Sequence, residues 1–253
     1  MEDVVTLILP SSVASSGVIT NTVSHYTTTL RTPIQLPEGY TYEAALIKLI
    51  YPCHVDNVID GSIEYWSFAF NSIMQTSITN GEYSMPTGLQ REFNTIMAHD
   101  SKYYVLTVDA SNHRYVLQCK SEKGKPPYIK LSKNLQSLTK LPEIIQKTGP
   151  TFGSTYFEEY GGMENMYVYV DFLHNTVVGD TVAPILNAVA FKGDANSFHP
   201  IEYEPINPIY MPLSKTYLDT ITVEIRTKTG EYFPFISGES LAVLHIRARS
   251  PKL

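Results

Sequence analysis

The chain has 253 residues, with 19 Lys and Arg against 25 Asp and Glu and a formal net charge of −6, so one large β-domain or two small domains are expected. Charged residues make up 17% of the chain, below the roughly 25% of a typical soluble domain. The chain also holds 18 Tyr residues, a type that suits interfaces that are partly apolar and partly wet. The composition favours a subunit with much covered surface, although a Tyr-rich β-protein without a partner would look the same.

Several classes of protein are excluded by the same data. No run approaches the roughly 18 apolar residues of a membrane-spanning helix, and Met1-Glu2-Asp3 lacks the positive start of a signal peptide. We therefore expect synthesis in the cytosol or nucleus without secretion. Cys53 and Cys119 have no CxxC spacing, so we expect buried free thiols rather than disulfides or zinc ligands. The net acidity, with dispersed basic residues, argues against a dedicated nucleic-acid site. We also expect no membrane span.

The first third of the chain predicts strands. Residues 22–30 are rich in Thr and in β-branched or aromatic residues. The Pro37-Glu38-Gly39 turn follows, and residues 43–51 are then apolar on both faces. This second strand is expected to be central and buried.

The middle third contains the helical patterns. Apolar residues at 89, 93, 96 and 97 follow a helical period, and Thr87 with Gln90 three residues later has the form of a capping box. A second helix is expected to begin at Ser132 and to end before Pro142. Between the two helices, strands at 103–108 and 114–119 are expected to form a hairpin.

The last third returns to strands. Residues 167–173 and 220–226 alternate between apolar and polar side chains, which predicts strands with one face on a core. Residues 193–208 are expected to form a long irregular loop. We infer a mainly β domain built from residues 1–63 and 151–253, with an α/β insertion over 64–150; the pattern leaves open whether the insertion is a separate domain.

Catalytic patterns are weak throughout. The seven His residues are scattered, without the HxH or HExxH spacing of a metal site. Glu158, Glu159 and Asp171 form the one acidic cluster near a predicted strand, but paired glutamates more often mark a solvated turn. Gly153-Ser154 lacks the frame of a nucleophile elbow. We expect no catalytic site, no cofactor and no metal.

A lysine-rich stretch covers residues 120–133. Its five lysines would suit nucleic acid or an acidic partner. A solvated hairpin tip is the commoner explanation for such a stretch.

A string of motifs runs through the end of the chain: Tyr210-Met211-Pro212, Asp219, Gly230, Phe235, Gly238 and Leu244-His245-Ile246-Arg247. It resembles the C-terminal signature of the minor capsid, or penton, proteins of Polinton/Maverick elements, adintoviruses and virophages. Tyr51-Pro52 near the start and Gly81-Glu82-Tyr83 in the middle are also similar to that family. Gly230 and Gly238 are expected at turns that require a positive φ.

The resemblance implies a single jelly-roll β-sandwich with an inserted small α/β region. It further implies a homopentamer at the five-fold vertices of an icosahedral virion, docked against major capsid protein capsomers, without catalysis. The insertion would be the natural carrier of contacts with a host receptor. The alternative is a jelly-roll or TNF-like binding module that recognises a glycan or a protein.

Overall fold

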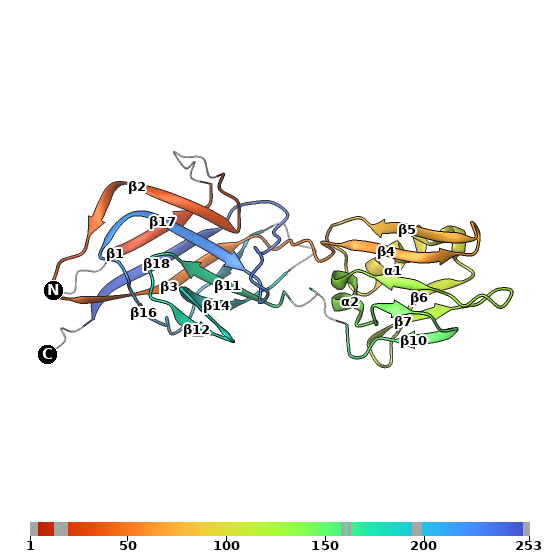
Figure 1. Cartoon of the computed structure of the whole chain (residues 1–253). Coiled ribbons are helices and arrows are strands. Elements are labelled where there is room, and N and C mark those ends of the chain that lie inside the picture. Colours follow the sequence, from red (N-terminus) through yellow and green to blue (C-terminus); the bar gives the residue numbers. More distant parts are fainter. Residues whose placement is uncertain (1–4, 13–19, 158–159, 161–162, 194–198, 250–253) are drawn as a thin grey trace. The chain divides into compact units, whose positions relative to one another are not determined.

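The computed structural model describes residues 5–12, 20–157, 160, 163–193 and 199–249 (Figure 1). The chain divides into two compact units. The sandwich unit comprises Met1–Val55 and Met163–Leu253, and the inserted unit comprises Asp56–Gly162. The predicted insertion, residues 64–150, is shorter than the inserted unit at both ends. Its first and last residues each fall inside a strand of that unit.

The sandwich unit consists of two antiparallel sheets. The strands of sheet A, in spatial order, are β1 (Val5–Pro10), β18 (Leu241–Arg249), β3 (Thr41–Tyr51) and, sharing the far edge, β15 (Ile201–Tyr203) and β16 (Met211–Pro212). Those of sheet B are β14 (Ile185–Ala190), β11 (Asn165–Val170), β17 (Tyr217–Arg226) and β2 (His25–Gln35). A small hairpin of β12 (Thr176–Val178) and β13 (Thr181–Ala183) lies between β11 and β14 along the chain.

The strand order is that of a jelly roll. If β15 and β16 count as one strand, the eight strands numbered along the chain lie in the order 1-8-3-6 in sheet A and 5-4-7-2 in sheet B. All pairs are antiparallel, as in the double-sheet jelly roll. The predicted fold class, a mainly β jelly-roll sandwich, is confirmed.

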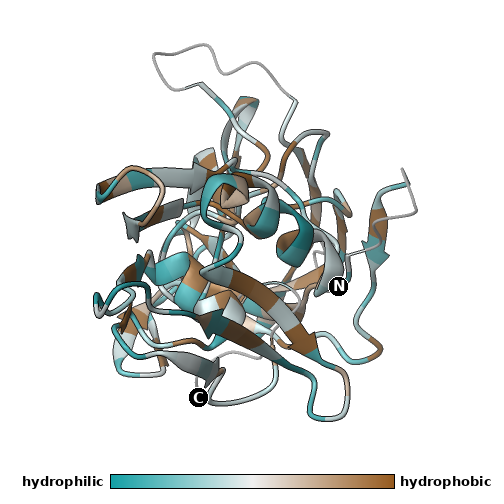
Figure 2. Ribbon diagram, turned by 90° about the vertical axis from the view of Figure 1, so that its right-hand side faces the viewer, coloured by the Kyte–Doolittle hydropathy of each residue, from teal (hydrophilic) through white to brown (hydrophobic). Residues whose placement is uncertain are grey.

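The core of the sandwich unit follows from the alternation in the sequence. Ile221, Val223 and Ile225 of β17 are buried, while the side chains between them are partly exposed. Leu244 and Ile246 of β18 are buried in the same way. The ribbon of Figure 2 shows brown and teal bands that alternate along several strands. Each fully buried aliphatic side chain contributes about 1.5–3 kcal/mol, so this alternation fixes which face of each strand is inside.

The first predicted strands differ from the observed ones. β2 runs past Leu30 to Gln35 and includes Pro33. Proline is tolerated there because β2 is an edge strand, where a missing N–H breaks no ladder. β3 is central, as predicted, but the prediction that both of its faces are buried is wrong. The outward side chains of Glu43 and Lys48 remain partly exposed.

The elements that were not predicted include β1 and β15 of sheet A. β1 pairs with β18 over Val5–Pro10; residues 1–4 and 13–19 lie outside the described residues. β15 pairs with β3 inside the stretch 193–208, which was expected to be irregular throughout. The three residues of β15 are too few for a periodic pattern to identify.

The inserted unit has two sheets and two α-helices. One sheet has the order β5 (Ser72–Ile78), β4 (Gly61–Ser67), β8 (Ile129–Leu131) and β9 (Ile144–Ile145). The other has the order β10 (Gly149–Phe152), β7 (Arg114–Cys119) and β6 (Tyr104–Asp109). The helices are α1 (Thr87–Ile96), with the short 3-10 turn η1 (Ala98–Asp100) after it, and α2 (Lys133–Thr139). This unit has its own apolar core, which includes Ile63, Leu89 and Leu135.

One of the two predicted helix starts is correct. Ser132 is the N-cap of α2, and its Oγ accepts the N–H of Leu135 at 3.2 Å. The capping box at Thr87 is wrong, because Thr87 is already the first residue of α1 and no side chain caps that helix. Pro86 stands at the cap position and has no side-chain acceptor to offer.

Both thiols are buried and free, as predicted. Burial raises the pKa of the Cys119 thiol to about 12. Among the described residues, no helix is long and apolar enough to cross a membrane.

Candidate functional surfaces

Three motif residues, Tyr210, His245 and Arg247, meet Glu43 on the outer face of sheet A, and we call these four side chains the Tyr210 cluster. The hydroxyl of Tyr210 lies 2.7 Å from Nδ1 of His245. The guanidinium carbon of Arg247 lies 3.5 Å from the centroid of the Tyr210 ring. Nε and Nη2 of Arg247 are each 2.7 Å from Oε1 of Glu43. The cluster combines a charge-assisted hydrogen bond with a cation–π contact.

Strand register explains why these residues meet. Arg247 of β18 lies opposite Glu43 of β3, and Pro212 of β16 lies opposite Glu43 from the other side. Tyr210 directly precedes β16, so its ring reaches over β3 toward β18. The Glu43 side chain is only 14% exposed, which strengthens its pairing with Arg247 relative to an open surface pair.

A second group of motif residues forms an aromatic corner, defined by Tyr51, Pro52, Phe235 and Gly238. The Tyr51 ring lies 6.2 Å from that of Phe235, and its hydroxyl accepts the backbone N–H of Lys192 at 3.3 Å. Burial raises the pKa of Tyr51. Gly238 has φ +99°, and a Cβ at that position would lie 3.1 Å from Cγ of Pro52. The corner therefore requires glycine for both conformation and space.

Of the remaining motif residues, four belong to the sandwich unit. Leu244 is in its core, and Gly230, with φ +85°, makes the turn after β17. Asp219 is exposed beside a register shift in β17. Pro212 is exposed in β16, and its carbonyl accepts the N–H of His174 at 2.9 Å.

Gly81 and Tyr83 belong to the inserted unit. Gly81 pairs with Val58, and the hydroxyl of Tyr83 donates to the carbonyl of Thr79 at 2.8 Å. The predicted site residues thus fall into separate structural groups rather than one pocket.

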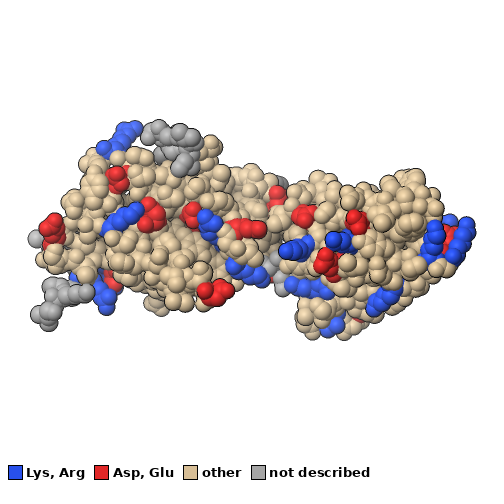
Figure 3. Space-filling view, in the orientation of Figure 1, with Lys and Arg blue, Asp and Glu red and all other residues tan. Residues whose placement is uncertain are grey.

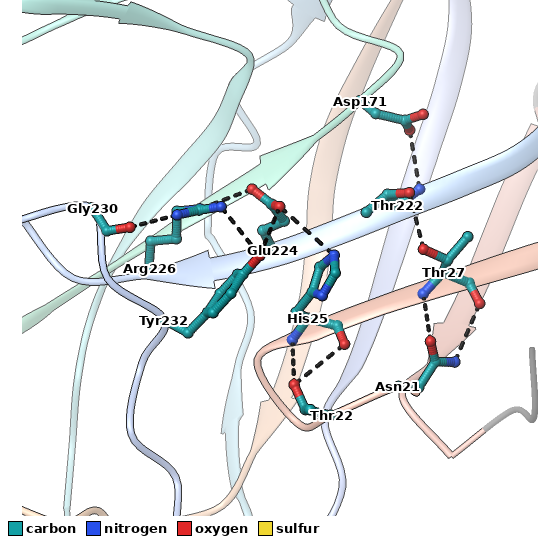
Figure 4. Close-up of polar contacts among 10 residues, drawn as sticks. All are labelled: Asn21, Thr22, His25, Thr27, Asp171, Thr222, Glu224, Arg226, Gly230 and Tyr232. Carbon is teal, nitrogen blue, oxygen red and sulfur yellow. Dashed lines mark hydrogen bonds and ion pairs between the residues drawn. The ribbon is translucent and has the colours of Figure 1, made fainter. Parts of the chain in front are cut away.

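Sequence reasoning missed a polar cluster on the outer face of sheet B, which we call the Glu224 cluster: His25, Glu224, Arg226 and Tyr232 (Figure 4). Nε of Arg226 donates to Oε2 of Glu224 at 2.8 Å, and Nε2 of His25 lies 3.8 Å from Oε1 of the same carboxylate. The Tyr232 ring stacks on His25 at 5.0 Å and lies 4.4 Å from the Arg226 guanidinium carbon.

The electrostatics of this cluster follow from those contacts. The hydrogen bond from Arg226 holds the pKa of Glu224 below its usual value, and burial opposes that shift. The alternation of β17 places Glu224 and Arg226 on the outer face, which the sequence predicts. No local pattern indicates that Tyr232 returns to cover His25, because those residues are far apart in the chain.

Of the three acidic residues weighed as catalytic groups, Asp171 has a structural role. Oδ1 of Asp171 accepts the backbone N–H of Thr222 at 3.0 Å, and its Oδ2 lies 3.3 Å from Nζ of Lys215, so this carboxylate joins strands. Glu158 and Glu159 lie outside the described residues. Within the described part of the chain, no three His, Cys, Asp or Glu side chains are grouped to hold a metal ion.

Apolar side chains are exposed at the edges of sheet A. Ile8 of β1 is 62% exposed, and Ile206 and Ile209, between β15 and β16, are 96% and 62% exposed. The face shown in Figure 3 carries dispersed charges on a largely uncharged surface. Apolar side chains exposed at a sheet edge can be buried when another protein binds there.

Comparisons with known proteins give matches among solved structures. No family model matches the sequence, and no curated protein matches it. Among solved structures, the chain is similar to the crystal structure of the selenomethionine-labelled mavirus penton protein. The identity is 9% and the TM-score 0.44, over 89% of this chain and 99% of the other.

Proposed function

We propose that this protein is a structural subunit of a virion, the penton at the five-fold vertices of an icosahedral capsid. The observation that carries the proposal is the eight-stranded jelly roll in which Tyr210 contacts both His245 and Arg247, three residues that carry the sequence resemblance. These motif residues join β18, β3 and the segment before β16. Such contacts stabilise a surface, which is what a structural subunit needs. The protein would act through its surfaces, without a cofactor.

A closed ring of identical subunits needs two different surfaces that meet around the axis. The sandwich unit offers two different edges, β1 with β2 and β14 with β15 and β16. In Figure 1, β1 and β2 lie above β14 and β16. Ile8 belongs to the first edge and Ile206 to the second, so each edge has an apolar side chain to bury. We infer that the homopentamer forms through these edges, while other faces dock against major capsid protein capsomers.

The test is the solution mass of the full chain, measured by light scattering at several protein concentrations. A species of five times 28.4 kDa supports the vertex proposal. A stable trimer would contradict it and would favour the jelly-roll or TNF-like binding module. A monomer at every concentration would contradict self-assembly of the purified subunit, and mixing with capsomers would then show whether they induce the pentamer.

Paired variants locate the ring contact. Ile8→Asp and Ile206→Asp place a charge on each proposed edge and are expected to yield monomers, because an unpaired charge is costly in an interface. Ile73→Asp is the matched control, because Ile73 is 59% exposed but belongs to the inserted unit. Retention of the pentamer in both edge variants would exclude these edges.

We also propose that the inserted unit carries contacts with a host receptor. Replacing Asp56–Gly162 by a short Gly/Ser linker is expected to leave the sandwich folded, because its strands pair only with one another. Retained assembly with lost infectivity supports this role. Full infectivity of particles with the shortened subunit would contradict it.

A further inference from the structure

A trough of about 470 Å³ lies on the sheet formed by β5, β4 and β8 in the inserted unit. Its floor includes Ser62 of β4 and Ser77 of β5, which are directly paired across the strands and exposed. The neighbouring pair on the same face, Glu64 and Gln75, has longer side chains. Two small hydroxyl side chains beside two long polar ones create the hollow.

Polar groups of complementary kinds line the trough. Glu64 is paired in register with Gln75 on one side and with Lys130 on the other. Oε2 of Glu64 accepts from Nε2 of Gln75 at 3.3 Å, and Oε1 accepts from the hydroxyl of Tyr128 at 2.6 Å. These bonds lower the pKa of Glu64, with that from Tyr128 as the largest cause. Its carboxylate is therefore oriented and ionised before any ligand arrives.

Lys130 of β8 lies on the other side of β4 from Gln75. Its ammonium lies 3.7 Å from Oε1 of Glu143, an open ion pair that leaves further donor capacity. One carboxylate, one ammonium, one amide and hydroxyl groups thus face the same space. The lining charges of Glu64 and Lys130 balance, so the trough does not select for a charged ligand.

Aromatic side chains adjoin the polar wall. Trp66, the single tryptophan of the chain, follows Glu64 by two residues on β4, so both side chains point to the same face of the sheet. Nζ of Lys125 lies 4.9 Å from the centroid of the Trp66 ring, which holds the lysine beside the indole. Tyr128 contacts the Glu64 carboxylate, and Trp66 follows on the same face of β4, so apolar ring surface lies beyond the Glu64 end of the trough, outside its lining.

We propose that this trough binds a neutral oligosaccharide. Adjacent hydroxyl groups of a sugar both donate and accept, and they match a wall of carboxylate, amide, ammonium and hydroxyl groups. The C–H face of a sugar ring is apolar and matches the ring surface beside the trough. The inference builds on the proposed attachment role of the inserted unit and names its ligand class and its site.

The experiment uses the full chain on a printed array of defined neutral, sialylated and sulfated oligosaccharides. The neutral oligosaccharide that binds best is then titrated, with the fluorescence of Trp66 as the readout. Ser62→Tyr fills the trough at an exposed strand position that favours aromatic residues, and it is expected to weaken binding at least tenfold. Glu64→Gln keeps the shape, removes the charge and is expected to weaken binding severalfold.

Gln118→Tyr is the matched control, because it introduces the same side chain on β7 in the other sheet of the inserted unit. It is expected to bind like the wild type, and circular dichroism of all three variants checks their folding. Absence of binding to any neutral oligosaccharide, binding of acidic glycans alone, or equal binding by Ser62→Tyr and the wild type would each overturn the proposal. A pentamer that binds no oligosaccharide would refute this site alone, whereas a trimer that binds one would refute the vertex role alone.

Discussion

Arg247 covers one face of the Tyr210 ring, and the same guanidinium group is hydrogen-bonded to Glu43. The ring of Tyr210, in the segment that leads into β16, is thereby fixed against strand β18. Its hydroxyl reaches His245 on the same strand as the arginine. Four side chains from three segments thus form one unit on the outer face of sheet A.

This arrangement predicts graded losses of stability. Tyr210→Phe removes only the hydrogen bond to His245 and is expected to lower the free energy of unfolding by about 0.5–1.5 kcal/mol. Arg247→Ala removes the ring contact and the ion pair together, with an expected loss of about 1–2 kcal/mol, because the arginine is 42% exposed. Urea denaturation measures both. Arg31→Ala, at an exposed position of β2, is expected to stay within about 0.5 kcal/mol of the wild type.

Substitution of Gly230 and Gly238 distinguishes the cost of a positive φ from the cost of steric crowding. Gly230 and Gly238 both have positive φ, but only a Cβ at position 238 meets a neighbour, Pro52, within 4 Å. Gly230→Ala is expected to lose about 1–2 kcal/mol from conformation alone, and Gly238→Ala is expected to lose more. The comparison is made from urea midpoints at equal m-values. Equal losses would show that Pro52 moves away without cost.

The Glu224 cluster predicts a specific response to acid. Because the folded-state pKa of Glu224 is lowered, its ionised form contributes stability that is present above the usual pKa of 4.5 and is lost as the pH falls through the lower folded-state value. Glu224→Gln is expected to cost about 1 kcal/mol near neutral pH. The gap between the variant and the wild type should then close as the pH falls.

Unfolding free energies between about pH 7 and pH 3 measure that gap. Glu38→Gln, at an exposed turn position, serves as the control and is expected to run parallel to the wild type. A gap of constant size for Glu224→Gln would contradict the role of its charge.

The two thiols predict slow labelling of the folded protein. Cys53 is 2% exposed and Cys119 is 1% exposed, and the raised pKa of Cys119 leaves little thiolate near neutral pH. A chromogenic disulfide reagent is expected to react with neither thiol in native protein and with both in concentrated guanidinium chloride. Cys53→Ser isolates the signal of Cys119. Rapid labelling of that variant without denaturant would show that the inserted unit opens readily.

The sequence predicts regular elements well and distant contacts poorly. Ile221, Val223 and Ile225 identify a core face because a strand repeats every two residues. The two residues of β16 give no period, and Thr87 looks like a cap although it is already helical. The stacking of Tyr232 on His25 depends on the path of the turn after β17, which no local pattern fixes.

The same limit applies to the surfaces. Arg247 and His245 can be singled out by motif, but their contact with Tyr210 follows from the register of three strands. The trough depends on the pairing of Ser62 with Ser77. Serine is unremarkable in the sequence and becomes informative only when the strands are aligned.

The strand order of the sandwich unit has a consequence for synthesis. β1, β2 and β3 form no ladder with one another; each pairs only with strands from the C-terminal part of the chain, β15 to β18. During translation these first strands therefore stay unpaired while Asp56–Gly162 is synthesised. The inserted unit can form its own core in that interval. The inserted unit can thus fold before the sandwich unit. Sheet A is complete only when the final strand, β18, has paired with β1 and β3.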